Sequence, residues 1–189
     1  MKVFVFDIQV DYFQSLGPVD PKEFEQESQL TRLLREPIEN NWHPIKVEVI
    51  RDMTGVDHPF PQAVGDFPWL TGGSGFLCLS RKAADRLRHL LLPHGKILPL
   101  ICEEGEYYLY KVTTVIDALD EEMSQFTRFS DGGIMTIEKH EFHPERLANA
   151  VIFKVPQDIV AIFVTDKFVS EIKKTDLKGY EFKEVWRSE

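Results

Sequence analysis

The chain has 189 residues, of which 43% are hydrophobic and 28% charged, with 11 glycines and 11 prolines. These proportions exclude a disordered chain and are typical of a globular domain, which at this length buries roughly 70% of the surface of its unfolded chain. The 31 acidic residues outnumber the 22 basic ones, and a net charge of −9 argues against nonspecific binding to nucleic acid or to an anionic membrane.

The two cysteines and the N-terminal sequence bear on localisation. Cys78 and Cys102 follow apolar residues, and we expect both to be small buried hydrophobic residues in strands, as in a reducing compartment. The N-terminal sequence MKVFVFDIQVDYF has one lysine and an early Asp7, and no apolar run approaches the ~18 residues needed to span a bilayer. We therefore expect a cytoplasmic protein without a signal peptide or a membrane anchor.

Hydrophobic periodicity predicts the elements of the first part of the chain. Residues 2–10 are apolar on both faces, which is typical of a buried strand, and residues 46–51 alternate as a second strand. Residues 21–34 predict a short amphipathic helix or turn that ends before Pro37, since a residue before proline avoids helical geometry. Residues 52–75 are rich in proline and glycine, but their aromatic residues indicate an ordered loop that packs onto the rest of the protein.

A strand, a helix and a hairpin are predicted next. Residues 76–79 have the composition of a short strand, and Ser80 is a suitable N-cap for a helix with leucines on one face. Residues 96–102 and 107–116 are both strand-like. The acidic turn Glu103-Glu104-Gly105-Glu106 separates them, so we expect a β-hairpin.

The remaining elements are shorter. They are, in order, a short helix or loop over residues 117–126, a strand over 133–142, a helical turn over 144–150, a strand pair over 151–155 and 159–164, a helix that Asp166 caps and that runs to Thr175, and a strand over 180–186. Strands and helices do not alternate regularly, which argues against a doubly wound parallel sheet. We predict a single α+β domain over residues 1–189, with a mixed or mostly antiparallel sheet and a few short helices.

Two segments contain parts of functional motifs. The glycine-rich segment 71–75 precedes a strand and lacks the Lys-Ser/Thr of a phosphate-binding loop, so we interpret it as a flexible turn. His140, Glu141 and His143 offer metal-binding atoms, but on a strand the two histidines would point to opposite faces, and no H-E-x-x-H motif completes a site. We predict neither a metal nor a cofactor.

No spacing of residues is typical of catalysis, and we predict that the protein is not an enzyme. The alternative is a small hydrolase or transferase with an active site assembled from scattered residues around His89, His94, His140 or His143. A third interpretation is a structural or regulatory subunit of a larger bacterial assembly. Aromatic and basic residues interleave only in residues 126–129, so nucleic-acid binding is not predicted.

Short motifs follow one another in a definite order over most of the chain. They are Trp42 with Pro44, Asp66-Phe67-Pro68, Leu79-Ser80 with Ala83, Leu87 and Leu91, Leu98-Pro99-Leu100, Tyr108 to Val112, Val115 to Asp120 with Ser124, Ile152-Phe153, Ile162 to Asp166 with Phe168, and Leu177, Gly179, Phe182 and Val185-Trp186. In this order and spacing the chain resembles the eleventh numbered family of bacterial immunity proteins, formerly a domain of unknown function. The resemblance spans roughly residues 42–186.

The resemblance implies a protein that binds a cognate bacterial toxin and blocks its activity. Most of the matching residues are interpreted as scaffold, so no binding residue of the family can be assigned to this chain. The net charge of −9 suits a basic toxin, and we therefore expect the contact at acidic turns. The candidate contact residues are Glu103, Glu104 and Glu106 first, and Glu121 and Glu122 second. We expect the protein to be a monomer or a weak dimer.

Overall fold

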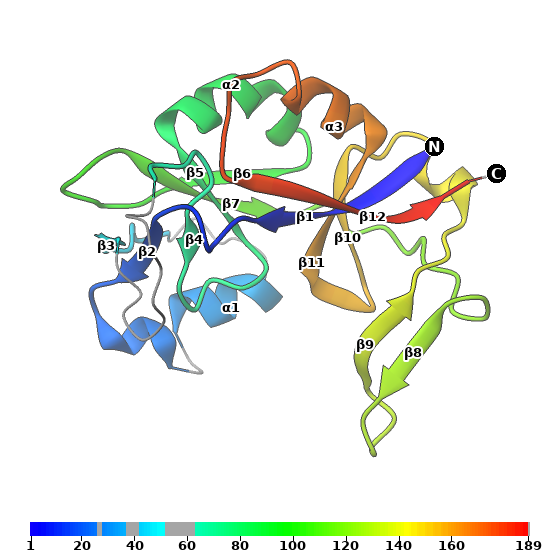
Figure 1. Ribbon diagram of the computed structural model, residues 1–189. Coiled ribbons are helices and arrows are strands. Elements are labelled where there is room, and N and C mark those ends of the chain that lie inside the picture. Colours follow the sequence, from blue (N-terminus) through cyan, green and yellow to red (C-terminus); the bar gives the residue numbers. More distant parts are fainter. Residues whose placement is uncertain (26–27, 37–41, 52–62, 189) are drawn as a thin grey trace.

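The structure is a computed structural model that describes residues 1–25, 28–36, 42–51 and 63–188. Its helices are short and most paired strands are antiparallel, which confirms the predicted α+β class (Figure 1). Pro37 and residues 52–62 of the predicted ordered loop lie outside the described residues.

The largest sheet joins the beginning of the chain to its end. It has the strand order β10-β11-β1-β12, and each neighbouring pair is antiparallel. Its strands are β1 (Lys2–Ile8), β10 (Ile152–Val155), β11 (Asp158–Thr165) and β12 (Tyr180–Arg187). The apolar strand predicted near the N-terminus is therefore confirmed, although it ends at Ile8, and it lies between two strands of the C-terminal part.

Three smaller sheets complete the strands. They are β3-β2-β4, with β2 (Ser15–Pro18), β3 (Val47–Ile50) and β4 (Trp69–Leu70); β5-β7-β6, with β5 (Leu77–Ser80), β6 (Gly95–Pro99) and β7 (Tyr107–Val112); and β8-β9, with β8 (Gln125–Arg128) and β9 (Ile134–Lys139). The hairpin predicted across the acidic turn is confirmed by the antiparallel pairing of β6 with β7. Strands β2, β4 and β8 are not predicted from the sequence.

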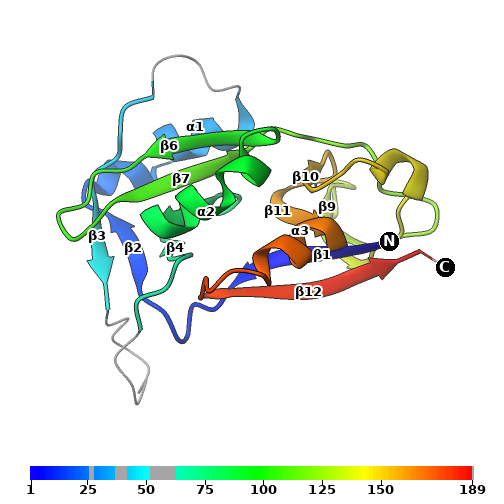
Figure 2. The same ribbon diagram turned by 90° about the horizontal axis from the view of Figure 1, so that it is seen from above.

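Helices cover two opposite sides of the molecule. They are η1 (Pro21–Phe24), α1 (Gln29–Arg35), α2 (Arg81–Leu91), η2 (Pro144–Leu147) and α3 (Asp166–Ile172). Helices α2 and α3 lie on one side and α1 on the other, as Figures 1 and 2 show. The single helix or turn predicted over residues 21–34 is two separate helices, because Ser28 caps the second one by accepting from the backbone of Thr31.

Helix caps explain one correct and one wrong prediction. Ser80 Oγ accepts from the Ala83 N–H at 3.1 Å, as expected for the N-cap of α2. The predicted cap Asp166 is instead the first residue of α3, and Thr165 is its N-cap. Thr165 Oγ1 donates to the Ala150 carbonyl at 2.9 Å, so this buried hydroxyl ties the start of α3 to the loop before β10 and does not cap the helix.

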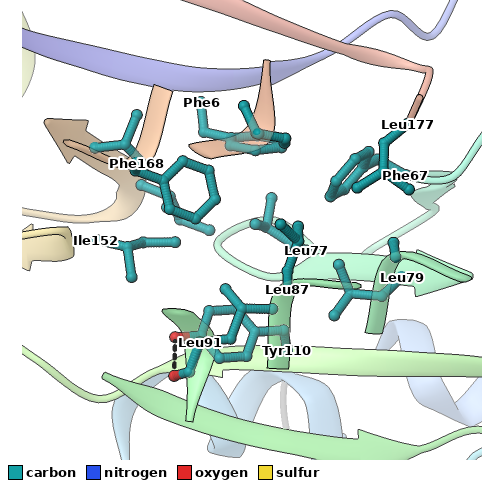
Figure 3. Close-up of a cluster of buried hydrophobic side chains, with 14 of the residues drawn as sticks. Phe6, Phe67, Leu77, Leu79, Leu87, Leu91, Tyr110, Ile152, Phe168 and Leu177 are labelled. Carbon is teal, nitrogen blue, oxygen red and sulfur yellow. Dashed lines mark hydrogen bonds between the residues drawn. The ribbon is translucent and has the colours of Figure 1, made fainter. Parts of the chain in front are cut away.

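The main core lies between the largest sheet and helices α2 and α3. Figure 3 shows Phe6 of β1 and Phe168 of α3 above Leu87 and Leu91 of α2. Tyr110 reaches the same cluster from β7, and its hydroxyl donates to the Leu91 carbonyl at 2.9 Å. This hydrogen bond satisfies the polar end of a fully buried side chain.

Strand β5 of the sheet β5-β7-β6 is buried on both faces. Leu77 and Leu79 belong to the main core, whereas Cys78, between them, belongs to a second cluster that includes Leu30 and Leu33 of α1. Alternate residues of a strand point to opposite faces, so both faces of β5 are covered. The prediction for Cys78 is confirmed, whereas Cys102 is only half-buried and lies outside the strands.

The Asp66-Phe67 motif joins distant parts of the chain. The Asp66 carboxylate accepts from Ser80 Oγ at 2.8 Å and from the Lys178 N–H at 2.9 Å. Phe67 is fully buried in the main core. Gly179, next to Lys178, has φ +95°, a conformation that favours glycine.

Candidate functional site

The acidic turn, residues Glu103–Glu106 between β6 and β7, contains the three glutamates that the sequence analysis ranks first as candidate contact residues. Each is paired with a cation from another part of the chain: Glu103 with Lys46 at 2.9 Å, Glu104 with Arg51, and Glu106 with Arg81 at 2.7 Å. The hydrogen bond from Lys46 lowers the pKa of Glu103 below its ordinary value. Exposed pairs of this kind contribute little stability, but they neutralise the charge of the turn locally.

Glu121 and Glu122 lie in a different setting, the turn that precedes β8. Asp120 Oδ1 accepts from the backbone N–H groups of Glu122 and Met123, both at 3.0 Å, and so fixes the turn. Both glutamates are exposed, and Glu121 accepts a hydrogen bond from Gln157 at 2.8 Å. No cation in the described part of the chain forms an ion pair with either of them.

The structure does not bring the two groups of glutamates together. The acidic turn lies at one end of the molecule in both orientations, and the β8–β9 hairpin, which follows Glu121 and Glu122, lies toward the other end (Figures 1 and 2). A single flat partner surface would therefore meet one group or the other.

The β8–β9 hairpin projects from the rest of the protein (Figure 1). Its two strands form a separate sheet and pair only with each other among the described strands. Near its base, Phe126 and Ile137 pack against a third core cluster, which includes Phe142, Phe153 and Phe163. Toward its tip, Phe129 and Met135 each expose 52% of their surface.

The four histidines of the enzyme alternative do not form a common site. His89 is exposed on α2, and His94 Nδ1 lies 3.3 Å from Thr114 Oγ1. His140 stacks on Phe142 and meets Phe163 edge to face, and burial lowers its pKa. His143 lies 4.0 Å from Asp120 and 3.7 Å from Glu145. In the described part of the chain, no hydrogen bond or ring contact joins two of these histidines.

The argument from the sequence against a metal site at His140 and His143 rests on a strand that the structure does not extend to these residues. His140 and His143 both lie beyond the end of β9, so alternation along a strand does not apply to them. Across the described ranges, no group of three or more histidine, cysteine or carboxylate side chains could hold a metal ion.

A groove of about 470 Å³ lies where β1 leaves the largest sheet. It is lined by residues 73–75 of the glycine-rich segment, by β11, by the aromatic residues Tyr12 and Trp69, and by three carboxylates, Asp7, Asp11 and Glu181. A second cavity of about 260 Å³ lies beside the acidic turn. Neither cavity is lined by a histidine, so neither supports a catalytic base of the kind that the enzyme alternative requires.

None of the helices in the described ranges has the length and apolar character that crossing a membrane requires.

The part of the chain from the acidic turn to β12 is similar to a known family. Residues 102–187 match the model of the immunity protein family Imm11. The family resemblance predicted from the sequence is thereby confirmed, over the C-terminal part of the span on which it was based. No curated protein matches the chain.

The matched segment, residues 102–187, contains all five candidate glutamates, the β8–β9 hairpin and three strands of the largest sheet. The fourth strand, β1, comes from outside this segment and lies between β11 and β12. The matched segment therefore forms its sheet together with the N-terminal strand.

Two buried lysines of the matched segment are missed by the sequence analysis. Lys154 Nζ donates to the carbonyls of Gly75 at 2.7 Å and Ile159 at 2.6 Å, and so ties the glycine-rich segment to β11. Lys111 donates to the carbonyls of Leu33 and Glu36 at the end of α1. Burial lowers the pKa of both, that of Lys154 to about 8. The sequence does contain a signal for these buried lysines, because each is the single lysine within an otherwise apolar or aromatic strand.

Proposed function

We propose that this protein is a bacterial immunity protein that binds a cognate toxin stoichiometrically and so blocks its activity. The observation that carries this proposal is the match of residues 102–187 to an immunity family. The chain would act in the cytoplasm as one domain, as a monomer or weak dimer, in competition between bacteria. It would need no catalysis, cofactor or metal, and neither nucleic acid nor membrane would be its partner.

A basic toxin is the partner that the charge of this protein favours. The net charge of −9 accelerates association with a cationic surface and disfavours acidic partners. Close charge pairs at a protein interface can also couple by roughly 1.5 to 7 kcal/mol. These effects favour a toxin with a basic surface, for example one that binds nucleic acid.

All five glutamates remain proposed contacts, but the structure changes their order. Glu103, Glu104 and Glu106 already hold cations of their own chain, and a toxin would have to compete with these. Glu121 and Glu122 are exposed with no such cation in the described residues. We therefore place Glu121 and Glu122 first.

Co-expression with the product of the neighbouring gene tests this function. In a cell that dies from that product alone, this protein should restore growth, and the two chains should purify together as a stable complex. A matched control expresses the same toxin with an unrelated acidic protein of similar size, which should not protect. Continued lethality, with no complex, would refute the immunity function.

A further inference from the structure

The β8–β9 hairpin lacks the support that the other strands of the structure have. An isolated two-stranded hairpin is marginally stable in water, and stable ones usually pack against a further strand or a helix. Here only the base of the hairpin is anchored, through Phe126 and Ile137, which are paired across the strands. The outer part extends away from the core and leaves Phe129 and Met135 half exposed.

The tip of this hairpin is nevertheless ordered by its own hydrogen bonds. The Phe129 N–H donates to the Gly133 carbonyl at 2.8 Å, and the Gly133 N–H donates to Asp131 Oδ1 at 2.9 Å. Arg128 also donates to the Gly132 carbonyl at 3.0 Å, and Gly132 has φ +90°. A tip held in one conformation can present Phe129 to a partner at a low entropic cost.

The turn with Glu121 and Glu122 is fixed at the base of the same hairpin. The Asp120 N–H donates to the Glu141 carbonyl at 2.9 Å, and the Glu141 N–H donates to Ser124 Oγ at 3.0 Å. These bonds join the residues before β8 to those after β9. Met123, in this turn, exposes 63% of its surface.

Most of the net charge of the protein lies in this part of the chain. Residues 117–145 contain eight carboxylates and two cations, Arg128 and Lys139, which is a charge of −6 out of the total of −9. Both cations are already engaged, Arg128 over the Phe126 ring at 5.0 Å and Lys139 with Glu141 at 2.7 Å. Asp117 is paired with Arg146, just beyond this range, at 3.6 Å, whereas Glu121 and Glu122 form no ion pair with a cation of the described residues. The exposed apolar residues are therefore accompanied by negative charge that is only partly compensated.

We propose that the β8–β9 hairpin and the turn Glu121–Met123 form the surface that docks on the toxin, and that the matching toxin surface is a basic patch around an apolar hollow. This assignment rests on the immunity function proposed above. Aromatic and methionine side chains are enriched in protein interfaces, and an acidic rim complements a basic partner. The whole surface lies within the segment that matches the immunity family.

The groove beside β1 is the other surface that could dock on the toxin. It also has carboxylates and an exposed aromatic residue, Tyr12, but Asp7, Asp11 and Tyr12 all lie outside the segment that matches the immunity family. It provides controls of similar chemistry for both the aromatic and the acidic residues of the hairpin surface.

Two pairs of matched variants test the assignment, with the purified product of the neighbouring gene, inactivated by mutation where necessary, as the probe. Phe129→Ser with Met135→Ser should weaken binding roughly tenfold or more, whereas Tyr12→Ser at the groove should change it less than about threefold. Glu121→Lys with Glu122→Lys should weaken binding by a similar factor and reduce its salt dependence, in contrast to Asp7→Lys with Asp11→Lys at the groove, where both carboxylates are also exposed.

Each variant is first compared with the unmodified protein by thermal unfolding, and affinity is then measured by calorimetry at two salt concentrations. The proposal stands if both hairpin variants lose clearly more affinity than their matched controls. It is overturned if they bind as the unmodified protein does, or weaken no more than the controls. If the unmodified protein itself neither binds nor protects, the immunity function fails and this surface fails with it.

Discussion

Phe163→Ala is expected to lower the free energy of unfolding by about 3–5 kcal/mol, the cost typical of truncating a large buried aromatic residue. Phe163 in β11 is fully buried, and its ring lies 5.6 Å from that of Phe153 and 5.7 Å from that of Phe142. Alanine would leave a cavity in the cluster against which the base of the hairpin packs. Chemical denaturation, monitored by circular dichroism, measures the change.

Phe129→Ala is the matched control, because it removes the same ring from an exposed position at the hairpin tip. Surface changes of this kind usually alter stability by no more than about 0.5 kcal/mol. If the two variants lowered the free energy of unfolding equally, the result would contradict the burial that the structure assigns to Phe163, or the exposure that it assigns to Phe129.

Lys154→Met is expected to remove a pH dependence of stability that the buried amine causes. Burial, with a smaller contribution from the nearby Lys111 cation, lowers the pKa of Lys154 from 10.5 to about 8. Between these values the unfolded chain binds more protons at this position than the folded protein, so the contribution of Lys154 to stability rises with pH. Over the whole interval this rise amounts to roughly 3 kcal/mol at most.

The measurement is the free energy of unfolding of both proteins at pH 7, 8, 9 and 10. Subtraction of the two curves removes the titration of groups that both proteins share. The stability of the unmodified protein relative to Lys154→Met should be constant up to about pH 8 and then increase. Lys173→Met, at an exposed position, serves as the control for loss of a lysine. A relative stability that stays constant from pH 7 to pH 10 would contradict the burial of Lys154.

The elements predicted correctly are those whose own residues carry the signal. The apolar strands β1, β7, β10 and β11 lie in or beside the core, where burial selects the pattern that the sequence shows. Helix α2 is recognisable for a similar reason, since its cap Ser80 and its buried face both lie within one short segment.

The elements missed depend on residues far away in the chain. Strand β2 contains Gly17 and Pro18, which normally interrupt strands, and it forms through pairing with β3 and β4. Strand β8 is largely polar and exposed, so its sequence shows no buried face, and it is defined by pairing with β9. Local patterns cannot show such pairing.

The candidate surface was predictable only in part. Acidic turns are visible in the sequence, and Glu121 and Glu122 were among the residues expected to contact the partner. The pairing of Glu103, Glu104 and Glu106 with distant cations could not be predicted, because it arises from the packing of β3 and α2 near the acidic turn. The exposure of Phe129 could not be predicted either, since most of the 14 phenylalanines would be expected in the core.

Titration of the toxin with this protein tests neutralisation by stoichiometric binding most directly. The activity of a fixed amount of toxin is measured after addition of increasing amounts of the purified protein, at two incubation times. Stoichiometric binding predicts a linear fall of activity to zero at a fixed molar ratio, with the same end point at both times. Complete loss of toxin activity at a small fraction of that ratio, progressing with time, would show catalytic inactivation and contradict the proposed function.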